Sequence, residues 1–386
     1  MNQERIYLDY AATTPLSQES LDAMRSVAQF AGFNPSSPHA EGRRARAALD
    51  DARDRVAAVL GAARGEIEFT ASGTESDNHA LHGVVRALGR RGHVLTTAVE
   101  HHAVLRAVEA LAEDGWAVTV LPVDGNGRID PAEFAAALRA DTQIASVMYA
   151  NNEIGTVEPI AELAALAHDR GVLFHTDAIA APSWLPLDVR ALGVDLLSLS
   201  AHKFYGPKGV GVLYVREGTP LTPLLHGGGQ EFGRRSGTEN VAGIAGLAAA
   251  LEPAANRRES SASRVRSLRD RLEAGISIAV PGLRINGAGA PRLPNVASVS
   301  FDGADPEALL ARLDLEGVAV SLGSACASGV LEPSHVLGAL RGAVLKSAGT
   351  IRFSLGTPTT QAQIERVLAI LPPVVEAVRR SAAAPA

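Results

Sequence analysis

The sequence predicts an α/β protein in which a mostly parallel, seven-stranded-type sheet is covered by helices and followed by a smaller α+β domain. Strand-like and helix-like segments alternate from about residue 45 to about residue 250. The strand-like segments are continuously apolar, which is typical of a parallel sheet buried on both faces. From about residue 256 the pattern changes to a charged helix followed by shorter mixed segments. We therefore expect a large domain over 15–255 and a small domain formed by 1–14 with 256–386.

The individual elements follow from periodicity and from helix stop signals. Apolar residues at helical spacing predict a helix over 45–61 that ends at Gly61. A strand is expected over 66–72 and a helix over 73–89. The remaining strands of the large domain are expected at 93–100, 117–123, 144–150, 172–179, 194–200 and 209–215, and its remaining helices at 103–115, 130–140 and 160–171. In the small domain we expect helices at 263–276 and 306–317 and strands at 295–301, 318–323 and 349–356.

Composition excludes several classes of protein. The formal net charge of −6 over 386 residues argues against a general nucleic-acid binder. The single cysteine, Cys326, rules out an intramolecular disulfide and a multi-cysteine metal site, and we expect no metal. The start of the chain has no apolar signal-peptide core, and no later apolar run of about 18 residues suggests a membrane span. The expected location is the cytoplasm.

Polar residues gather where the expected strands end, which is where ligands bind in open α/β sheets. They are Ser72-Gly73-Thr74, Glu100-His101-His102, Asn151-Asn152-Glu153, Asp177, and His202-Lys203. Each has an ordinary alternative reading. Ser72 or Thr74 can be a plain helix N-cap, one histidine can be a satisfied polar residue, and the asparagines can form a turn. A buried carboxylate such as Asp177, however, needs a cation or an N–H donor.

Taken together, these residues predict a cofactor. An anion cradle, an acid, an amine, an imidazole and an amide at one sheet edge suit a molecule with a phosphate, a basic ring nitrogen and an aldehyde. Pyridoxal 5'-phosphate has all three groups, since a lysine forms its Schiff base and an aspartate holds its pyridinium nitrogen. This interpretation explains why Lys203 follows a buried strand: the amine becomes an imine rather than a buried ammonium.

Nine ordered motifs resemble the cysteine desulfurases of the NifS/IscS type, in the class-V group of fold-type-I pyridoxal-phosphate enzymes. The motifs are "YLDYAATTP", "TASGTESDN", "EHHAVL", "NNEIGTV", "HTDA", "SLSAHKFYGPKG", "RRSGT", "GSACAS" and "IRFSLG". They run from residue 6 to about residue 370, so the resemblance covers nearly the whole chain.

The resemblance implies a role for each matching residue. Lys203 is implied as the Schiff-base lysine, Asp177 as the partner of the pyridine nitrogen, and His101 as the ring-stacking residue and proton carrier. The residues implied to hold the phosphate are Gly73, Thr74, Ser200 and His202, with Thr238 reaching the phosphate of the other subunit of a homodimer. Asn152 is implied to touch the phenolic oxygen or the substrate, and Arg352 to clamp the carboxylate of L-cysteine by a bidentate pair.

Cys326 carries the chemistry that distinguishes this family from other pyridoxal-phosphate enzymes. A lone cysteine is ordinarily a buried inert thiol, but its setting "SLGSACASGV" is small and without bulky anchors. The resemblance implies that its thiolate takes the sulfur of L-cysteine, leaving alanine and a persulfide that passes to an acceptor protein.

Two departures from the family bear on function. Where the family usually has a glutamine three residues after Asp177, this chain has Ala180, so we expect altered cofactor electronics and modest turnover with cofactor binding retained. The chain also ends without the longer tail that docks scaffold proteins in the IscS type. Sulfur supply for iron–sulfur clusters and for DNA or tRNA thiolation, including the DNA-phosphorothioation branch, therefore both stay open.

Three alternatives to a cysteine desulfurase remain. A selenocysteine lyase or a class-V aminotransferase has the same fold, although an aminotransferase has no use for Cys326. A non-catalytic scaffold is disfavoured because the lysine, the aspartate and the cysteine are all present.

Overall fold

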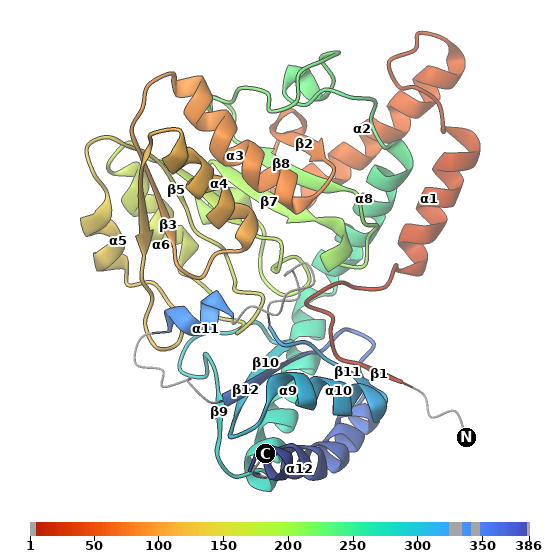
Figure 1. The fold of residues 1–386 in the computed structure, drawn as a ribbon. Helices are drawn as coiled ribbons and strands as arrows, with labels where there is room; N and C mark the ends of the chain where they lie inside the picture. Colours follow the sequence, from red (N-terminus) through yellow and green to blue (C-terminus); the bar gives the residue numbers. More distant parts are fainter. Residues whose placement is uncertain (1–4, 324–333, 341–347, 384–386) are drawn as a thin grey trace.

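The computed structural model describes residues 5–323, 334–340 and 348–383. Figure 1 shows a larger part built around one sheet and, below it, a smaller part that contains the C-terminal helix. Among the described residues, no helix is long and apolar enough to span a bilayer.

The sheet of the larger part has seven strands in the order β2-β8-β7-β6-β5-β3-β4. The strands are β2 (Ile67–Thr70), β3 (His93–Thr97), β4 (Ala117–Leu121), β5 (Thr142–Ser146), β6 (Leu173–Asp177), β7 (Leu196–Ser200) and β8 (Gly211–Val215). The five strands from β7 to β4 are parallel, and β8 runs antiparallel to both β7 and β2. The predicted fold class, a mostly parallel sheet in an α/β protein, is confirmed.

Helices cover both faces of this sheet because adjacent strand residues point to opposite sides. Ile144 and Leu196 pack with helices α3 (Gly73–Leu88) and α4 (His102–Glu113), whereas their neighbours Ala145 and Leu197 belong to the core on the other face. The helices that contribute to this second core are α2 (Ala40–Leu60), α5 (Pro131–Ala137), α6 (Ile160–His168), α7 (Val189–Leu192) and α8 (Val241–Asn256). Burial on both faces accounts for the continuously apolar strands.

Outside the sheet core, α1 (Gln18–Phe30) packs along α8, and α2 ends at Gly61 as predicted. Gly61 has a φ of +64° and its N–H bonds the carbonyl of Ala57, a helix end that glycine adopts without strain. Three short 3₁₀ turns complete this part: η1 (Arg64–Glu66), η2 (Ala201–Lys203) and η3 (Glu231–Gly233).

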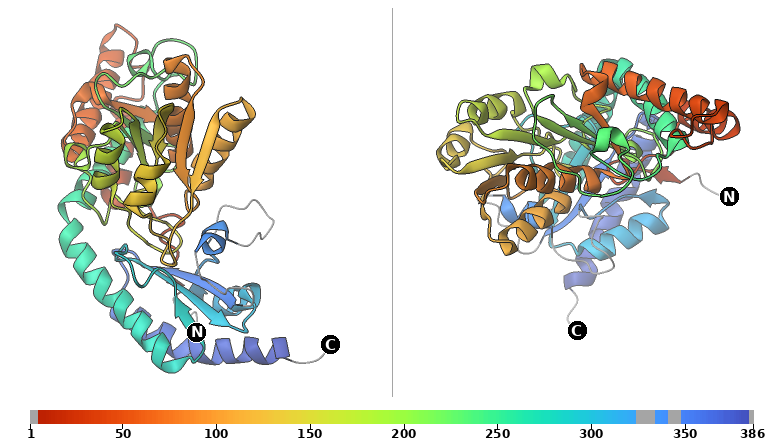
Figure 2. Two further views of the ribbon diagram at one scale, coloured as in Figure 1. Left: turned by 90° about the vertical axis from the view of Figure 1, so that its left-hand side faces the viewer. Right: turned by 90° about the horizontal axis from the view of Figure 1, so that it is seen from above.

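The smaller part has its own sheet and its own core. Its antiparallel sheet has the order β12-β10-β9, and a two-stranded parallel pair joins β1 to β11. The strands are β1 (Ile6–Tyr7), β9 (Leu283–Ile285), β10 (Val296–Asp302), β11 (Val318–Ala319) and β12 (Ala348–Ser354), and the helices are α9 (Arg258–Ala279), α10 (Pro306–Leu315), α11 (His335–Ala339) and α12 (Gln361–Ala383). Figure 2 shows α8 and α9 running one after the other along one side of the molecule, where they link the two parts.

The N-terminal segment lies against the smaller part although it precedes the larger one. Ile6 and Leu8 are buried in the core of the smaller part, and β1 pairs with β11 in register Ile6 to Val318. The segment then crosses to the larger part, where the backbone N–H of Thr14 bonds the carbonyl of His202. It therefore passes directly beside the carboxyl end of β7.

Candidate active site

A cavity of about 410 Å³ opens at the carboxyl ends of β2, β5, β6 and β7. Of the residues singled out in the sequence, its wall contains Gly73, Thr74, His101, Asn152, Asp177, Ser200, His202 and Lys203. The structure thus brings eight predicted site residues together at one sheet edge. Arg352 and Thr238 lie outside this wall, and Cys326 lies outside the described residues.

The N-terminus of α3 faces the cavity as an anion cradle. Ser72 caps the helix, with its Oγ accepting a bond of 3.1 Å from the backbone N–H of Glu75. A Cβ added to Gly73 would come within 2.2 Å of Ile179 Cδ1 and 3.2 Å of Ser200 Cβ, so only glycine fits this close approach. The free backbone N–H groups and the positive end of the helix dipole favour a phosphate here.

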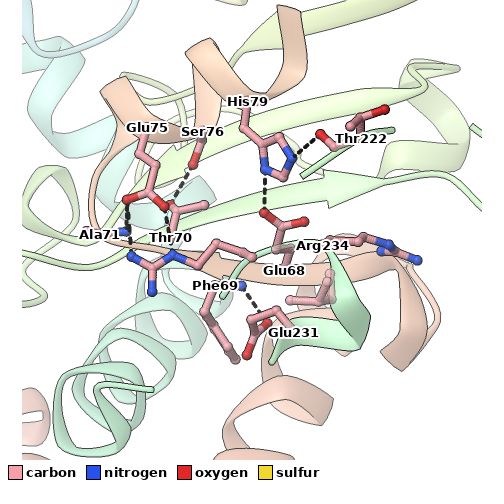
Figure 3. A network of polar contacts seen from close by, with 12 residues as sticks. Glu68, Phe69, Thr70, Ala71, Glu75, Ser76, His79, Thr222, Glu231 and Arg234 are labelled. Atoms are coloured by element: carbon pink, nitrogen blue, oxygen red, sulfur yellow. Dashed lines mark hydrogen bonds and ion pairs between the residues drawn. The ribbon is translucent and has the colours of Figure 1, made fainter. Parts of the chain in front are cut away.

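Polar contacts fix the strand and turn that lead into this cradle (Figure 3). Glu75 accepts a bond of 2.8 Å from the backbone N–H of Ala71, and Glu68 contacts His79 Nδ1 at 2.7 Å. Thr70 Oγ1 and Ser76 Oγ lie 2.8 Å apart. Because each contact joins β2 or its turn to α3 itself, the cradle is held in place within one strand–turn–helix unit.

Thr238 lies in the adjoining loop rather than in the wall of this chain's cavity. It lines a separate space of about 140 Å³ together with Glu231 and Arg235. Arg235 Nε donates to Glu75 Oε1 at 2.8 Å, and the carboxylate of Glu231 accepts from the backbone N–H of Phe69 at 2.9 Å. The loop is therefore tied to the cradle of its own chain, while the predicted contact of Thr238 with a second subunit stays a prediction.

Asp177 ends β6 and supplies the acid of the site. It is buried, and its Oδ1 accepts a bond of 2.9 Å from the backbone N–H of Ile179. Burial raises the pKa of Asp177 to about 6, against the opposing effects of this bond and of Lys203. A cationic ring nitrogen beside the carboxylate would stabilise its charged form.

Lys203 ends the 3₁₀ turn that follows β7, and two backbone carbonyls hold its amine. Nζ donates to the carbonyl of Ala11 at 2.5 Å and to that of Ala12 at 2.9 Å. Both acceptors belong to the crossing N-terminal segment, so a lysine directly after a buried strand is accommodated by a second piece of chain. Sequence reasoning missed this contribution of Ala11 and Ala12, because backbone carbonyls leave no residue-type signal.

Two histidines of the wall are held in the neutral form. His101 caps α4, its Nδ1 accepting from the backbone N–H of Ala103 at 3.1 Å, which places the ring proton on Nε2. Burial and then the charge of Lys203 lower the pKa of His101 to about 4. The same two causes lower the pKa of His202 to about 4, and its Nδ1 lies 3.2 Å from Thr13 Oγ1. Thr13, which also lines the cavity, is a further contact that the sequence did not single out.

Arg352 lies beside the cavity with its guanidinium already engaged. Nη1 donates to the carbonyls of Asn152 and Gly323, each at 3.0 Å, and Nη2 donates to Asp9 Oδ1 at 2.8 Å. Its predicted contact with a substrate carboxylate stays a prediction. The side chain of Asn152 lines the cavity, as does that of Ala180, which leaves the position of the usual glutamine with a methyl group.

The donor set fits pyridoxal 5'-phosphate. The cradle at Gly73 and Thr74 suits a phosphate, the buried carboxyl of Asp177 suits a protonated ring nitrogen, and Lys203 supplies the amine for the aldehyde. No group of three or more metal-ligating side chains occurs among the described residues. Together the doubly covered sheet and this cavity define a fold-type-I pyridoxal-phosphate enzyme.

Comparison with known proteins agrees with this class and narrows it. Residues 6–367 match the family "Aminotransferase class-V", and the chain belongs to that family. It is 47% identical to "Cysteine desulfurase IscS" of Dictyoglomus turgidum over 378 residues, which cover 98% of this chain and 96% of the relative. The resemblance predicted from the motifs and the predicted cofactor are both confirmed.

Two solved structures show the same fold at substantial sequence identity. A "NIFS-LIKE PROTEIN" superposes with a TM-score of 0.90 at 36% identity and covers 96% of this chain and 99% of its own. "SspA in complex with cysteine" superposes with a TM-score of 0.80 at 35% identity and covers 92% and 100% of the two chains.

Proposed function

We propose that the protein is a cysteine desulfurase that converts L-cysteine to L-alanine and passes the sulfur, as a persulfide on Cys326, to an acceptor protein. The observation that carries the proposal is the meeting of Lys203, Asp177, His101 and the α3 cradle on one cavity. The relative from Dictyoglomus turgidum is named as such an enzyme, and a similar structure contains cysteine.

The wall residues divide the binding of the cofactor among them. Gly73, Thr74, Ser200 and His202 hold the phosphate, and Asp177 faces the ring nitrogen. Bound pyridoxal phosphate would supply the electron sink that stabilises the electron pair left on the substrate when its C–S bond breaks. Because His101 is neutral with its proton on Nε2, it can stack on the ring and carry a proton between the substrate and solvent.

The sulfur step belongs to Cys326. Its thiolate attacks the sulfur of bound L-cysteine, so that an S–S bond forms as the C–S bond breaks. The electron pair of the broken bond stays with the substrate carbon, which takes a proton and becomes the methyl group of alanine. The persulfide then gives its outer sulfur to a thiol or another nucleophile of the acceptor.

The chain works as a homodimer in this proposal, with Thr238 reaching the phosphate of the other subunit. In its support, large apolar side chains are exposed near the loop that carries Thr238, among them Phe232 at 57% and Leu225 at 45%. We also propose a cytoplasmic location, where a catalytic thiol stays reduced, and delivery of sulfur to iron–sulfur assembly or to DNA or tRNA thiolation.

The division into a large domain over 15–255 and a small domain of 1–14 with 256–386 remains part of the proposal. It is supported by the two separate apolar cores and by the burial of Ile6 and Leu8 in the second one. The junction would lie where α8 passes into α9.

The experiment is to incubate the purified holoenzyme with L-cysteine and measure alanine, sulfide and persulfide on Cys326. We expect equal amounts of alanine and released or bound sulfur, and none in Cys326→Ser, which should keep its yellow colour. Parallel incubations with L-selenocysteine and with an amino acid plus a 2-oxo acid test the alternatives. Turnover in one of these alone, with none from L-cysteine, would overturn the proposal.

A further inference from the structure

Arg352 is buried with a counter-ion that belongs to its own chain. The guanidinium has 1% exposed surface, and the side chain of its partner Asp9 has 20%. Nη2 donates to Asp9 and Nη1 to the carbonyls of Asn152 and Gly323, whereas Nε is buried and has no hydrogen-bond partner among the described residues. Within the described part of the chain, the Asp9 carboxylate makes one hydrogen bond, from Nη2 of Arg352 to its Oδ1.

The same short segment also holds the lysine. Asp9 precedes Ala11 and Ala12, whose carbonyls accept the two bonds from Lys203 Nζ. The backbone N–H of Ala12 bonds the carbonyl of Asp9, so the two contacts share one turn. The segment therefore connects Arg352 to Lys203 over four residues of chain.

We propose that Asp9 is a positioning residue that holds Arg352 until substrate arrives, and that the carboxylate of the amino acid replaces Asp9 on the guanidinium. The inference rests on the proposed function, in which Arg352 receives a substrate carboxylate. It assigns to Asp9 the role of an internal competitor that sets the selectivity of the site for carboxylate ligands.

Charge and burial both favour an exchange of this kind. A buried guanidinium without a counter-ion is strongly unfavourable, so the free site needs Asp9. Asp9 is the more exposed partner and regains hydration when it leaves, whereas Arg352 remains enclosed. The charge of Arg352 is compensated before and after the exchange.

The unsatisfied Nε of Arg352 explains why a ligand carboxylate should replace Asp9. Nε and Nη2 form one edge of the guanidinium, and a carboxylate can accept from both atoms of such an edge. Asp9 accepts from Nη2 alone, and no other described residue satisfies Nε. A ligand carboxylate that bonds both atoms gains the contact that Asp9 lacks.

The exchange also links substrate binding to Lys203. When Asp9 leaves Arg352, the turn loses one of the contacts that keep the carbonyls of Ala11 and Ala12 against the amine. A ligand without a carboxylate leaves the turn in place. Carboxylate recognition is thereby coupled to the position of the turn that lies against Lys203.

The test compares ligands with and without a carboxylate in holoenzyme variants. Dissociation constants for L-alanine and for cysteamine are measured by calorimetry in the wild type, Asp9→Asn, Asp9→Glu and Asp314→Asn. Asp9→Asn removes the competing charge, so L-alanine should bind about tenfold more tightly, while cysteamine should be unchanged. Asp9→Glu should restore the wild-type constant.

Asp314→Asn is the matched control, because Asp314 pairs with Arg5 at an exposed site and neither residue lines the cavity. It should leave both ligands unchanged. Weaker or unchanged binding of L-alanine to Asp9→Asn, or an equal shift for both ligands, would overturn the inference. Binding as expected without alanine production from L-cysteine would instead refute only the proposed function.

Discussion

The two sides of the cavity are built in different ways. We call Gly73, Thr74, Asp177, Ser200 and Lys203 the cofactor wall, since each ends a strand of the seven-stranded sheet or lies in the helix or turn that comes after one. We call Asp9, Asn152 and Arg352 the substrate wall after their proposed role; Asn152 lines the cavity and the other two lie behind it, and their contacts join residues up to 343 positions apart. The first wall is positioned by the sheet, the second by the docking of three distant segments.

This difference shows where rigidity and adjustment lie. The strand and helix around the cradle are joined by polar contacts of 2.7–2.8 Å between residues close in sequence, two of them between buried side chains. The substrate wall contains an ion pair with one partly exposed partner and one unsatisfied donor. The first construction suits a cofactor that stays bound, and the second suits a substrate that is exchanged in each reaction.

Lys203 belongs to the cofactor wall and contacts the segment that carries Asp9, and its replacement should have the largest effect. Lys203→Ala should abolish the yellow absorbance of bound cofactor and reduce desulfurase activity by about 10³-fold or more. The measurement is a visible spectrum after reconstitution, together with alanine production. Lys208, which lines the same cavity, provides the control: Lys208→Ala should keep the yellow band. A band retained in Lys203→Ala and lost in Lys208→Ala would reassign the amine.

Gly73→Ala tests whether the cofactor wall is as rigid as its contacts indicate. The new Cβ would meet Ile179 Cδ1 at 2.2 Å and Ser200 Cβ at 3.2 Å, so the cradle must open. We expect pyridoxal phosphate to bind about tenfold more weakly or worse, measured by fluorescence titration of the apoprotein. The control is Gly65→Ala, where no atom lies within 4 Å of the added Cβ. Equal affinity in the two variants would mean that the cradle rearranges around the added Cβ without weakening cofactor binding.

The cofactor wall was largely predictable from the sequence, whereas in the substrate wall Asn152 and Arg352 were named from the resemblance and Asp9 was not predicted. Residues at the ends of apolar strands must meet at one edge, so Asp177, His202 and Lys203 could be brought together from pattern alone. The pair of Asp9 and Arg352 depends on docking β12 against the N-terminal segment, which no local period records. The contacts of Thr13 and of the carbonyls of Ala11 and Ala12 were not predicted, for the same reason.

Some elements of the fold were also not predicted from local sequence patterns. The helices α1, α8 and α12 were not among the expected elements. α8 is apolar and small-residue-rich on nearly all sides because it is buried, and α12 contains Pro372 and Pro373. A helix buried on every side has no polar face to reveal its period. The two prolines of α12 are typical of the end of a helix rather than of its interior.

A third prediction concerns the polar layer behind the cofactor wall. His175 is fully buried between Ser146 Oγ at 2.8 Å and Ser198 Oγ at 3.0 Å, and burial lowers its pKa to about 3. The unfolded chain, with an ordinary histidine pKa near ~6.5, binds a proton that the folded chain excludes. Stability should therefore fall as the pH falls from about 6.5 towards 3, by up to about 1.4 kcal/mol per pH unit from this residue.

Denaturant unfolding of the apoprotein across this pH range measures the slope. His175→Gln cannot take up the proton, so the slope should be smaller by this contribution. The difference between the two proteins isolates His175 from other groups that titrate in the same range. Identical slopes would mean that His175 is not held neutral in the folded protein.

The smallest effect is expected at Ala180, where the cofactor wall departs from the family pattern. Ala180 lines the cavity and gives no hydrogen-bond donor to the cofactor's phenolic oxygen, whereas a glutamine would. Ala180→Gln should supply a bond of about 1 kcal/mol, which corresponds to about fivefold tighter cofactor binding. Because that bond favours the charged oxygen, the pH midpoint of the cofactor's absorbance should fall as well. An absorbance titration measures both effects. If the variant had the midpoint of the wild type, another group of the wall would already donate a hydrogen bond to the phenolic oxygen. The cofactor wall would then tolerate the loss of one donor, as the substrate wall tolerates the exchange of one acceptor.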